Sequence, residues 1–239
     1  MNGTWRGFVC GFGDLNAGVG GVAWDLGEPG AMLLTDGKAR PASFAIEEGG
    51  DAATLELSAE GAEVEATLTP EAAPVALAGP VESLGVVDCK ADVRPAGAAK
   101  TVRCQGQIAR WSGDVVAGAA TFRYLTVEKG DELLIVTATG SPDAPGHGED
   151  RTAGWRLQGE DATPFEETLI STQYDGRDRP TRIGVELWPE DANQSSRAAA
   201  TRVAGSALGG VNTGGTWSGL FRCHADGTEG LGIYLLRRG

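Results

Sequence analysis

Apolar and polar residues alternate along most of this chain, in short runs separated by turns rich in glycine. Residues 54–58 and 63–68 give the clearest example, because they flank a turn at 59–62. Folding about that turn places Leu55 opposite Leu68 on one face, with Glu56 and Glu65 on the other. This alternation predicts a half-buried β-hairpin.

Three further pairs of segments follow the same pattern. Residues 119–128 and 131–139 are the most apolar pair and are expected at the centre of the core. Residues 169–174 and 181–188 flank a charged turn, and residues 86–93 and 101–108 flank a turn that contains Pro95. Residues 196–208 fit either a short helix or a strand, and a strand is preferred because the neighbouring segments are β. No segment has a clear helical period over three turns, so the chain is predicted to be all-β and antiparallel.

The two ends of the chain carry matching segments. Residues 3–10 have the sequence Gly-Thr-Trp-Arg-Gly-Phe-Val-Cys, and residues 215–223 have the sequence Gly-Thr-Trp-Ser-Gly-Leu-Phe-Arg-Cys. Matching end strands are most simply explained by a closed barrel, in which the first and last strands pair and leave no open edge. We therefore predict a single β-barrel domain over residues 1–239, with a β-sandwich as the alternative. The connector at 70–80, which contains three prolines, could separate two sub-barrels, but a crossing loop is favoured.

The pairing of segments also suggests which of the four cysteines are neighbours. A symmetric hairpin over 86–108 puts Cys89 opposite Cys104. These two could form a disulfide if oxidised and if the cross-strand geometry allows it, and the alternative is two small buried thiols. Cys10 and Cys223 would be neighbours if the two ends pair.

The Gly-Thr-Trp segments resemble the Gly-x-Trp opening of the lipocalin and wider calycin group. This resemblance implies a barrel whose tryptophan closes one end, with an arginine of the last strand packed over it, for which Arg237 or Arg238 is suitably placed. The repeat of the motif is similar to the two-barrel calycins typified by carotenoid hydratases and by terpenoid and tocopherol cyclases. Residues 148–155 loosely resemble the Asp-containing, Trp-terminated motif of that group, although spacing and order differ. The resemblance implies an apolar cavity that holds a lipophilic molecule.

Composition excludes several partners. The net charge is −13, which repels nucleic acid and anionic membranes, and no cluster of basic residues compensates for it. No apolar run reaches the roughly 20 residues that span a bilayer. The N-terminal residues lack the basic region and apolar core of an export signal, so the chain is predicted to be cytoplasmic with reduced cysteines.

Histidines and carboxylates supply the candidate chemistry. His147 and His224 lie in glycine-rich turns beside carboxylates, where histidine can act as a general acid or base. The two histidines and a nearby carboxylate could hold a metal, but no His-x-His or Cys-x-x-Cys spacing occurs, so no metal or other cofactor is expected. Acid-initiated cyclisation or hydration would instead need a protonated carboxyl group in an apolar pocket and aromatic rings that stabilise a carbocation. The predicted catalytic residues are Asp150, Glu149, His147, Glu186 and His224, and the predicted ligand-binding residues are Trp155, Trp188, Trp24, Tyr124 and Phe122.

Three functions stay open on these grounds. The first is an enzyme that cyclises, hydrates or isomerises a lipophilic, isoprenoid or polyketide-like molecule inside the barrel. The second is a binding protein for a hydrophobic small molecule, and the third is a structural or interaction protein. Enzyme and binding protein both need a cavity above about 300 Å³, and the third function follows from a filled core.

Overall fold

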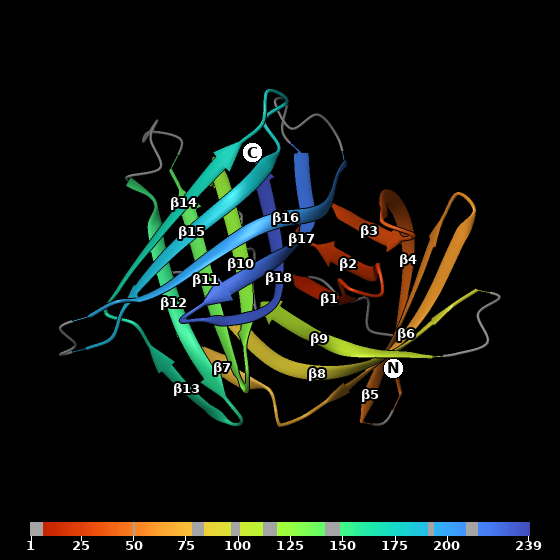
Figure 1. Cartoon of the computed structure of the whole chain (residues 1–239), viewed down its shortest axis with the longest axis horizontal. Helices are drawn as coiled ribbons and strands as arrows, with labels where there is room; N and C mark the ends of the chain where they lie inside the picture. Colours follow the sequence, from red (N-terminus) through yellow and green to blue (C-terminus); the bar gives the residue numbers. More distant parts are fainter. Residues whose placement is uncertain are drawn as a thin grey trace. The chain divides into compact units, whose positions relative to one another are not determined.

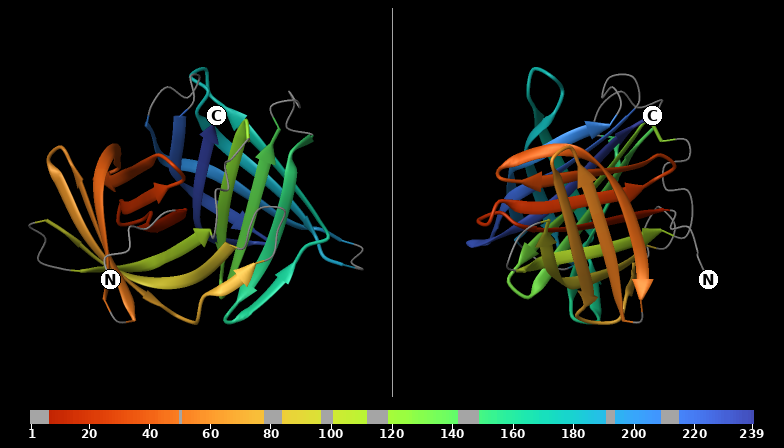
Figure 2. Two further views of the ribbon diagram at one scale, coloured as in Figure 1. Left: turned by 180° about the vertical axis from the view of Figure 1, so that it is seen from behind. Right: turned by 90° about the vertical axis from the view of Figure 1, so that its right-hand side faces the viewer.

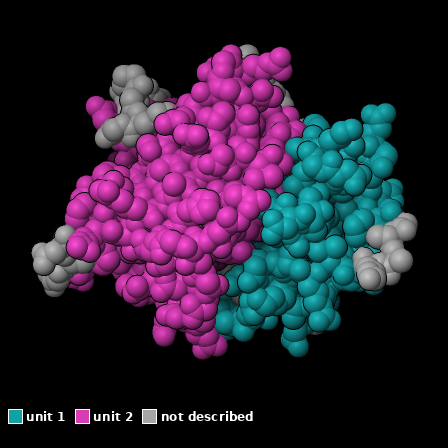
Figure 3. Space-filling model, viewed as in Figure 1, with its two compact units in different colours: residues 1–115 teal, residues 116–239 magenta. Residues whose placement is uncertain are grey.

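A computed structural model of the chain describes residues 7–49, 51–77, 84–96, 101–111, 119–141, 149–190, 194–208 and 215–239 (Figure 1). Eighteen strands form two antiparallel sheets, and the described residues contain no α-helix, as the alternation predicts. The chain divides into unit 1, residues 1–115, and unit 2, residues 116–239 (Figure 3). This corrects the expected single barrel over 1–239. The division also lies well beyond the connector at 70–80.

Unit 1 is a closed barrel of eight strands with one extra edge strand. Pairing runs from β6 through β5, β4, β3, β2, β1 and β9 to β8, and β8 then pairs with β6 and closes the ring (Figure 2). The strands are β1 (Phe8–Asp14), β2 (Val19–Asp25), β3 (Pro29–Thr35), β4 (Lys38–Gly49), β5 (Ala52–Ala59), β6 (Ala62–Pro70), β7 (Val75–Leu77), β8 (Leu84–Pro95) and β9 (Val102–Trp111).

Alternate side chains of these strands fill the interior of the unit 1 barrel. Phe8, Cys10 and Phe12 of β1 point inward together with Leu55 and Leu57 of β5, and all five are buried. Strands β1 to β3 bury almost every residue on both faces, which explains why their sequences are continuously apolar. The interior of this barrel is therefore packed with side chains.

Unit 2 is a second curved antiparallel sheet, ordered β13-β12-β11-β10-β18-β17-β16-β15-β14. Thr152 donates from Oγ1 to the carbonyl of Thr168 at 2.6 Å, and the Phe165 N–H donates to the carbonyl of Gly154 at 2.9 Å. These bonds bring β14 against β12, so the sheet curls back on itself. Its strands are β10 (Thr121–Lys129), β11 (Glu132–Gly140), β12 (Arg151–Gln158), β13 (Asp161–Pro164), β14 (Glu167–Tyr174), β15 (Pro180–Trp188), β16 (Ser196–Leu208), β17 (Gly215–Ala225) and β18 (Thr228–Arg238).

The predicted pairing of first and last strands holds within each unit and not across the whole chain. In unit 1, β1 pairs with β9, and in unit 2, β10 pairs with β18. Strands β1 and β18 belong to different sheets, so the expected pairing of the two chain ends is wrong. Cys10 and Cys223 accordingly lie in different interior clusters.

The matching end segments have a different explanation, which is a circularly shifted repeat. Strand β17 lies between β16 and β18, as β1 lies between β9 and β2. Phe8 faces Arg110 in the first ladder, and Phe221 faces Arg202 in the second. Both motif-bearing strands therefore occupy the same place in the order of their barrels. Trp5 lies outside the described residues.

Beside each of the two motif-bearing strands, β1 and β17, lies an arginine that the sequence did not indicate. Arg110 lies on β9, which pairs with β1, and Arg202 lies on β16, which pairs with β17. The two arginines therefore occupy equivalent places in the two units. Arg237 and Arg238, which the resemblance suggested as the arginine packed over the tryptophan, lie at the end of β18, opposite Thr216 and Gly215. The guanidinium carbon of Arg238 lies 5.3 Å from the ring centroid of Tyr174.

Two predicted registers are shifted by two residues. Cys89 faces Gly106 and Cys104 faces Ala91, so the expected opposition of the two cysteines is wrong, and all four cysteines are free thiols. Burial raises the pKa of the Cys89 thiol to about 12. In the 54–68 hairpin, Leu55 faces Ala66, with the apolar and acidic faces as predicted. Residues 196–208 form the preferred strand.

Asp88 lies where β8 changes its partner from β7 to β6, and it gives a pH-dependent prediction. Burial, followed by the charge of Glu71, raises its pKa from 3.8 to about 6. Because the pKa of Asp88 is higher in the folded than in the unfolded chain, its protonated carboxyl group stabilises the fold fully at pH values below the unfolded pKa. That stabilisation is lost as the pH rises from about 4 to 6. We expect Asp88→Asn to raise the free energy of unfolding by about 1–3 kcal/mol at pH 7 and to change it little at pH 4. Urea unfolding at both pH values measures this.

Asp92→Asn is the matched control for that experiment. Asp92 lies on the same strand, and its exposed carboxylate accepts from Arg103 Nε at 3.0 Å. Equal stability of Asp88→Asn and the unmodified protein at pH 7 would show that the Asp88 charge costs the fold nothing.

Candidate functional site

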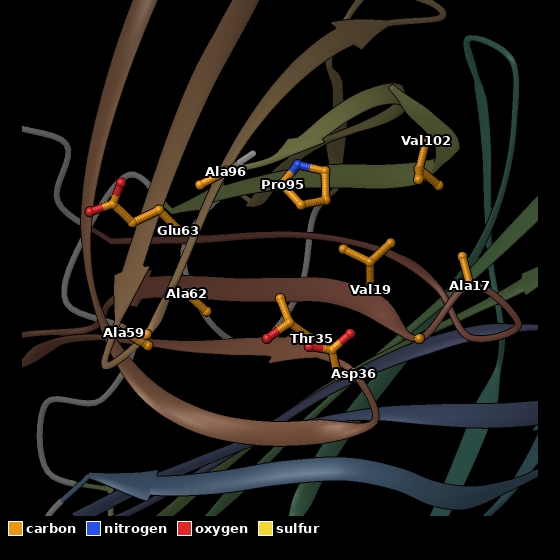
Figure 4. Close-up of a pocket in the computed structure, with 12 residues that line it drawn as sticks. Ala17, Val19, Thr35, Asp36, Ala59, Ala62, Glu63, Pro95, Ala96 and Val102 are labelled. Carbon is orange, nitrogen blue, oxygen red and sulfur yellow. The ribbon is translucent and has the colours of Figure 1, made fainter. Parts of the chain in front are cut away.

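A hollow of about 480 Å³ opens at one end of the unit 1 barrel, and we call it the mouth (Figure 4). Four hairpin connections surround it: β1–β2, β3–β4, β5–β6 and β8–β9. Val19, Val102, Ala59 and Ala62 line it and also pack against the interior cluster, so they form an apolar floor. The mouth is therefore a lined recess on top of a packed core.

Tight turns keep the rim of the mouth open. Asp36 and Gly37 have φ values of 52° and 69°, and Gly61 has 72°, which permits short β3–β4 and β5–β6 turns that do not cross the opening. Asp14 holds the β1–β2 turn, because its Oδ1 accepts from the N–H groups of Asn16 and Ala17 at 2.9 Å.

Few polar side chains line the mouth. They are Thr35, Asp36 and Glu63, and the Thr35 hydroxyl accepts from Arg40 Nη1 at 3.0 Å. In Figure 4 the Glu63 carboxylate points away from Val19 and Asp36. The mouth therefore offers an apolar floor with one hydroxyl and one carboxylate at its rim.

The opposite end of the same barrel is closed. The rings of Phe8 and Phe44 meet edge to face, with centroids 5.8 Å apart. Beyond them Arg110 of β9 forms an ion pair with Glu48 of β4. Because β9 and β4 are not neighbours in the sheet, this pair spans the end of the barrel.

In unit 2 the turns equivalent to those of the mouth are joined by a lysine. Lys129, at the end of β10, contacts Glu132 at 3.2 Å and Asp226, in the β17–β18 turn, at 3.0 Å. In barrel order β10 corresponds to β3, where unit 1 has Thr35 and Asp36 instead. Unit 1 therefore has no lysine at the equivalent position of β3.

At its other end the unit 2 barrel contains a buried polar group. Arg123 and Asp150 form an ion pair, with 1% and 3% of their side-chain surfaces exposed. Arg123 Nη1 also donates to the carbonyl of Ile170 and to Thr172 Oγ1, both at 3.4 Å, and the Tyr234 hydroxyl lies 3.4 Å from that oxygen. Burial raises the pKa of Tyr234, which keeps its hydroxyl protonated.

The predicted catalytic residues are not brought together as one described site. Asp150 is buried against Arg123, whereas the neighbouring Glu149 is exposed. Glu186 pairs with Arg197 at 3.2 Å on the outer face of β15, and His224 lies 3.8 Å from Glu229 with 58% of its side chain exposed. His147 lies outside the described residues.

The predicted aromatic residues do not line either interior. Ala23 belongs to the unit 1 interior, so its neighbour Trp24 points to the opposite face. The same alternation places Phe122 and Tyr124 on the outer face, because Leu125 points inward, and places Trp188 there beside the inward Leu187. Trp155 is buried, but it also lies outside the interior cluster. Among the described residues, the fully buried aromatic rings of the unit 2 interior are instead those of Trp217, Phe221 and Tyr234.

Two features, the buried Arg123 and the mouth, were not predicted from the sequence. Arg123 has the same parity as the inward-facing Leu125 and Val127, so a charged residue at an interior position was visible in the alternation. The mouth had no such signal, because small residues in four separate turns line it. Among the described residues, no group of three His, Cys, Asp or Glu side chains could hold a metal ion. The described part of the chain has no helix long and apolar enough to cross a membrane.

Comparison with known proteins supports the fold. No family model matches the sequence, and no curated protein does. The crystal structure of NE1406, a candidate AttH protein of Nitrosomonas europaea, is similar, with a TM-score of 0.70 at 12% identity over 96% of this chain and 90% of that one. CghA is also similar, both alone (TM-score 0.60, 10% identity, 97% of this chain and 87% of that one) and with Sch210972 (0.59, 10%, 97% and 88%). At such low identity these likenesses extend to the fold, a calycin-like barrel architecture.

Proposed function

We propose that this protein binds a lipophilic small molecule in the mouth of its first barrel. The observation that carries the proposal is the hollow of about 480 Å³ with its apolar floor. Its volume lies within the range of about 300–1,000 Å³ that is usual for small-molecule sites. A few polar groups at the rim, Thr35 and Asp36, would orient a ligand without defining a reaction.

The proposed binding site lies at the mouth, whereas the resemblance to lipocalins implies a site inside the barrel. A lipocalin-like cavity would lie inside the barrel, but the interior clusters of both units consist of buried side chains. A ligand at the mouth would rest on that packed core. The similar structure of CghA was determined with Sch210972, which supports small-molecule binding by this architecture. The location of the proposed site rests on the residues of this chain alone.

Acid-initiated cyclisation, hydration or isomerisation receives less support from the described carboxylates. Asp150 is buried as the reaction requires, but it already accepts from Arg123, whereas a general acid must hold a proton to donate. Glu186 is paired with Arg197, and Glu149 is exposed. The carboxylate at the mouth, Asp36, is exposed as well.

Filling the mouth should weaken binding. Ala62, the first residue of β6, lies half-buried in the floor of the mouth, so a phenylalanine there would place its ring in the ligand's space. We expect Ala62→Phe to weaken binding of the neutral fluorescent probe 1-aminoanthracene at least about tenfold, a loss of about 1.4 kcal/mol. A fluorescence titration of the full chain measures it, with circular dichroism as the check on folding.

The control is the same substitution away from the mouth. Ala76 is exposed on β7 and does not line the mouth, so Ala76→Phe should bind the probe as the unmodified protein does. Unchanged affinity in a folded Ala62→Phe variant would sink the proposal.

A further inference from the structure

A second hollow, of about 410 Å³, adjoins the mouth on the outer face of the barrel. It lies over β5, β6 and the end of β8, and it shares Glu63, Pro95 and Ala96 with the mouth. The Ala96 N–H donates to the carbonyl of Glu63 at 2.8 Å, which fixes the rim between the two hollows. A ligand longer than the mouth can therefore pass over this rim and continue in the outer hollow.

The outer hollow is acidic where the mouth is apolar. Because Val64 points into the barrel, Glu63 and Glu65 on either side of it point outward. Glu56 lies directly opposite Glu65 in the β5–β6 ladder, and all three glutamates line the outer hollow. The two hollows thus differ in chemistry on the two sides of one strand.

The positive charge within the outer hollow balances only part of this cluster. Arg94 Nη1 contacts Glu65 at 3.3 Å. Within the described ranges, Glu56 and Glu63 have no ion pair or side-chain hydrogen bond. Like charges placed directly opposite in a sheet destabilise it. A cation bound beside Glu56 and Glu63 would relieve that repulsion.

We propose that the ligand is a cationic amphiphile, with its apolar part in the mouth and an ammonium or guanidinium group in the outer hollow. This inference rests on the proposed function and specifies the class of ligand for the same site. The two carboxylates without partners supply charge complementarity, and the net charge of −13 favours a cation over an anion in the same place. Both glutamates are exposed, so the preference is moderate and decreases with salt.

Three probes with the same tail test the proposal: decylamine, 1-decanol and decanoate, each below its aggregation concentration, titrated into the full chain by calorimetry. We expect decylamine to bind about tenfold tighter than 1-decanol, and decanoate to bind most weakly. The Glu56→Gln/Glu63→Gln variant should lose most of the preference for the amine over the alcohol. Glu160→Gln/Glu167→Gln, which removes two exposed carboxylates from unit 2, should behave as the unmodified protein.

The outcomes separate this inference from the proposed function. Equal binding of amine and alcohol, or a preference for the amine that survives Glu56→Gln/Glu63→Gln, overturns the cationic ligand and leaves the mouth as a binding site. If no probe binds, or if Ala62→Phe binds all three as before, the proposed function is wrong, and the inference that rests on it is overturned too.

Discussion

Replacing Asp150 by leucine is expected to lower the free energy of unfolding by about 3–5 kcal/mol. The reason is the environment of its partner, because Arg123 is 1% exposed and would be left as a buried charge without its carboxylate. The carbonyl of Ile170 and the hydroxyl of Thr172 are neutral and lie 3.4 Å from Nη1, so they cannot replace the ion pair. Guanidinium unfolding of the full chain measures the loss.

The double variant Arg123→Met/Asp150→Leu should recover most of that stability. Both charges are then absent, and apolar side chains of similar length fill the space. Glu186→Gln breaks an exposed pair with Arg197 and should change stability little. If Asp150→Leu alone left stability unchanged, the Arg123 charge would not be confined to the barrel interior as the structure has it.

Trp217→Ala is the second change with a large expected effect, about 3–5 kcal/mol of unfolding free energy. Its ring is completely buried and meets Phe221 at 5.9 Å and Tyr234 at 6.1 Å between centroids. The ring rests on Gly205 and Gly219, which face each other in the β16–β17 ladder, and a Cβ on either would overlap the indole. The Gly-Thr-Trp-Ser-Gly motif thus combines Trp217 with Gly219, whose lack of a side chain leaves room for the indole.

This contact predicts that the stability effects of substitutions at Gly205 and Trp217 depend on each other. Gly205→Ala should cost about 1–3 kcal/mol alone, because the added Cβ would overlap only the indole of Trp217, and much less when Trp217 is already alanine. Gly176→Ala lies in open space and is the neutral control. Additive effects of Trp217→Ala and Gly205→Ala would contradict this contact.

Local pattern predicted the elements well, because alternation depends on which face of a strand is buried. The hairpins at 54–68, 119–139 and 169–188 were confirmed on this basis, and the 54–68 hairpin was wrong only in its register. Register depends on turn length as well, and a slip of two residues leaves every side chain on its predicted face. Such a slip is invisible to the pattern, which explains the expected opposition of Cys89 and Cys104.

Global connectivity was predicted less well, for a physical reason. Two similar strands at the ends of a chain satisfy a single closed barrel, and they equally satisfy two barrels whose strand order is shifted along the chain. The Gly-Thr-Trp segments could not distinguish these, because the motif reports where a tryptophan packs and not which strands flank it. The Phe8–Arg110 and Phe221–Arg202 oppositions become visible only in the ladders.

Candidate chemistry was the least predictable level. His224 and Glu186 were selected for residue type, and the structure places both on outer, solvated faces. The mouth instead consists mainly of Ala, Gly, Pro and Val residues from separate turns, which carry no chemical signal until the fold brings them together.

The central claim, that a ligand occupies the mouth of the first barrel, is tested most directly by localising a bound probe. Methyl NMR of the full chain during titration with 1-aminoanthracene should shift the resonances of Val19 and Val102, which line the mouth. Val127 and Val185, inside unit 2, should stay unchanged. Shifts confined to the unit 2 valines, or saturable binding without any shift at Val19 and Val102, would contradict the claim.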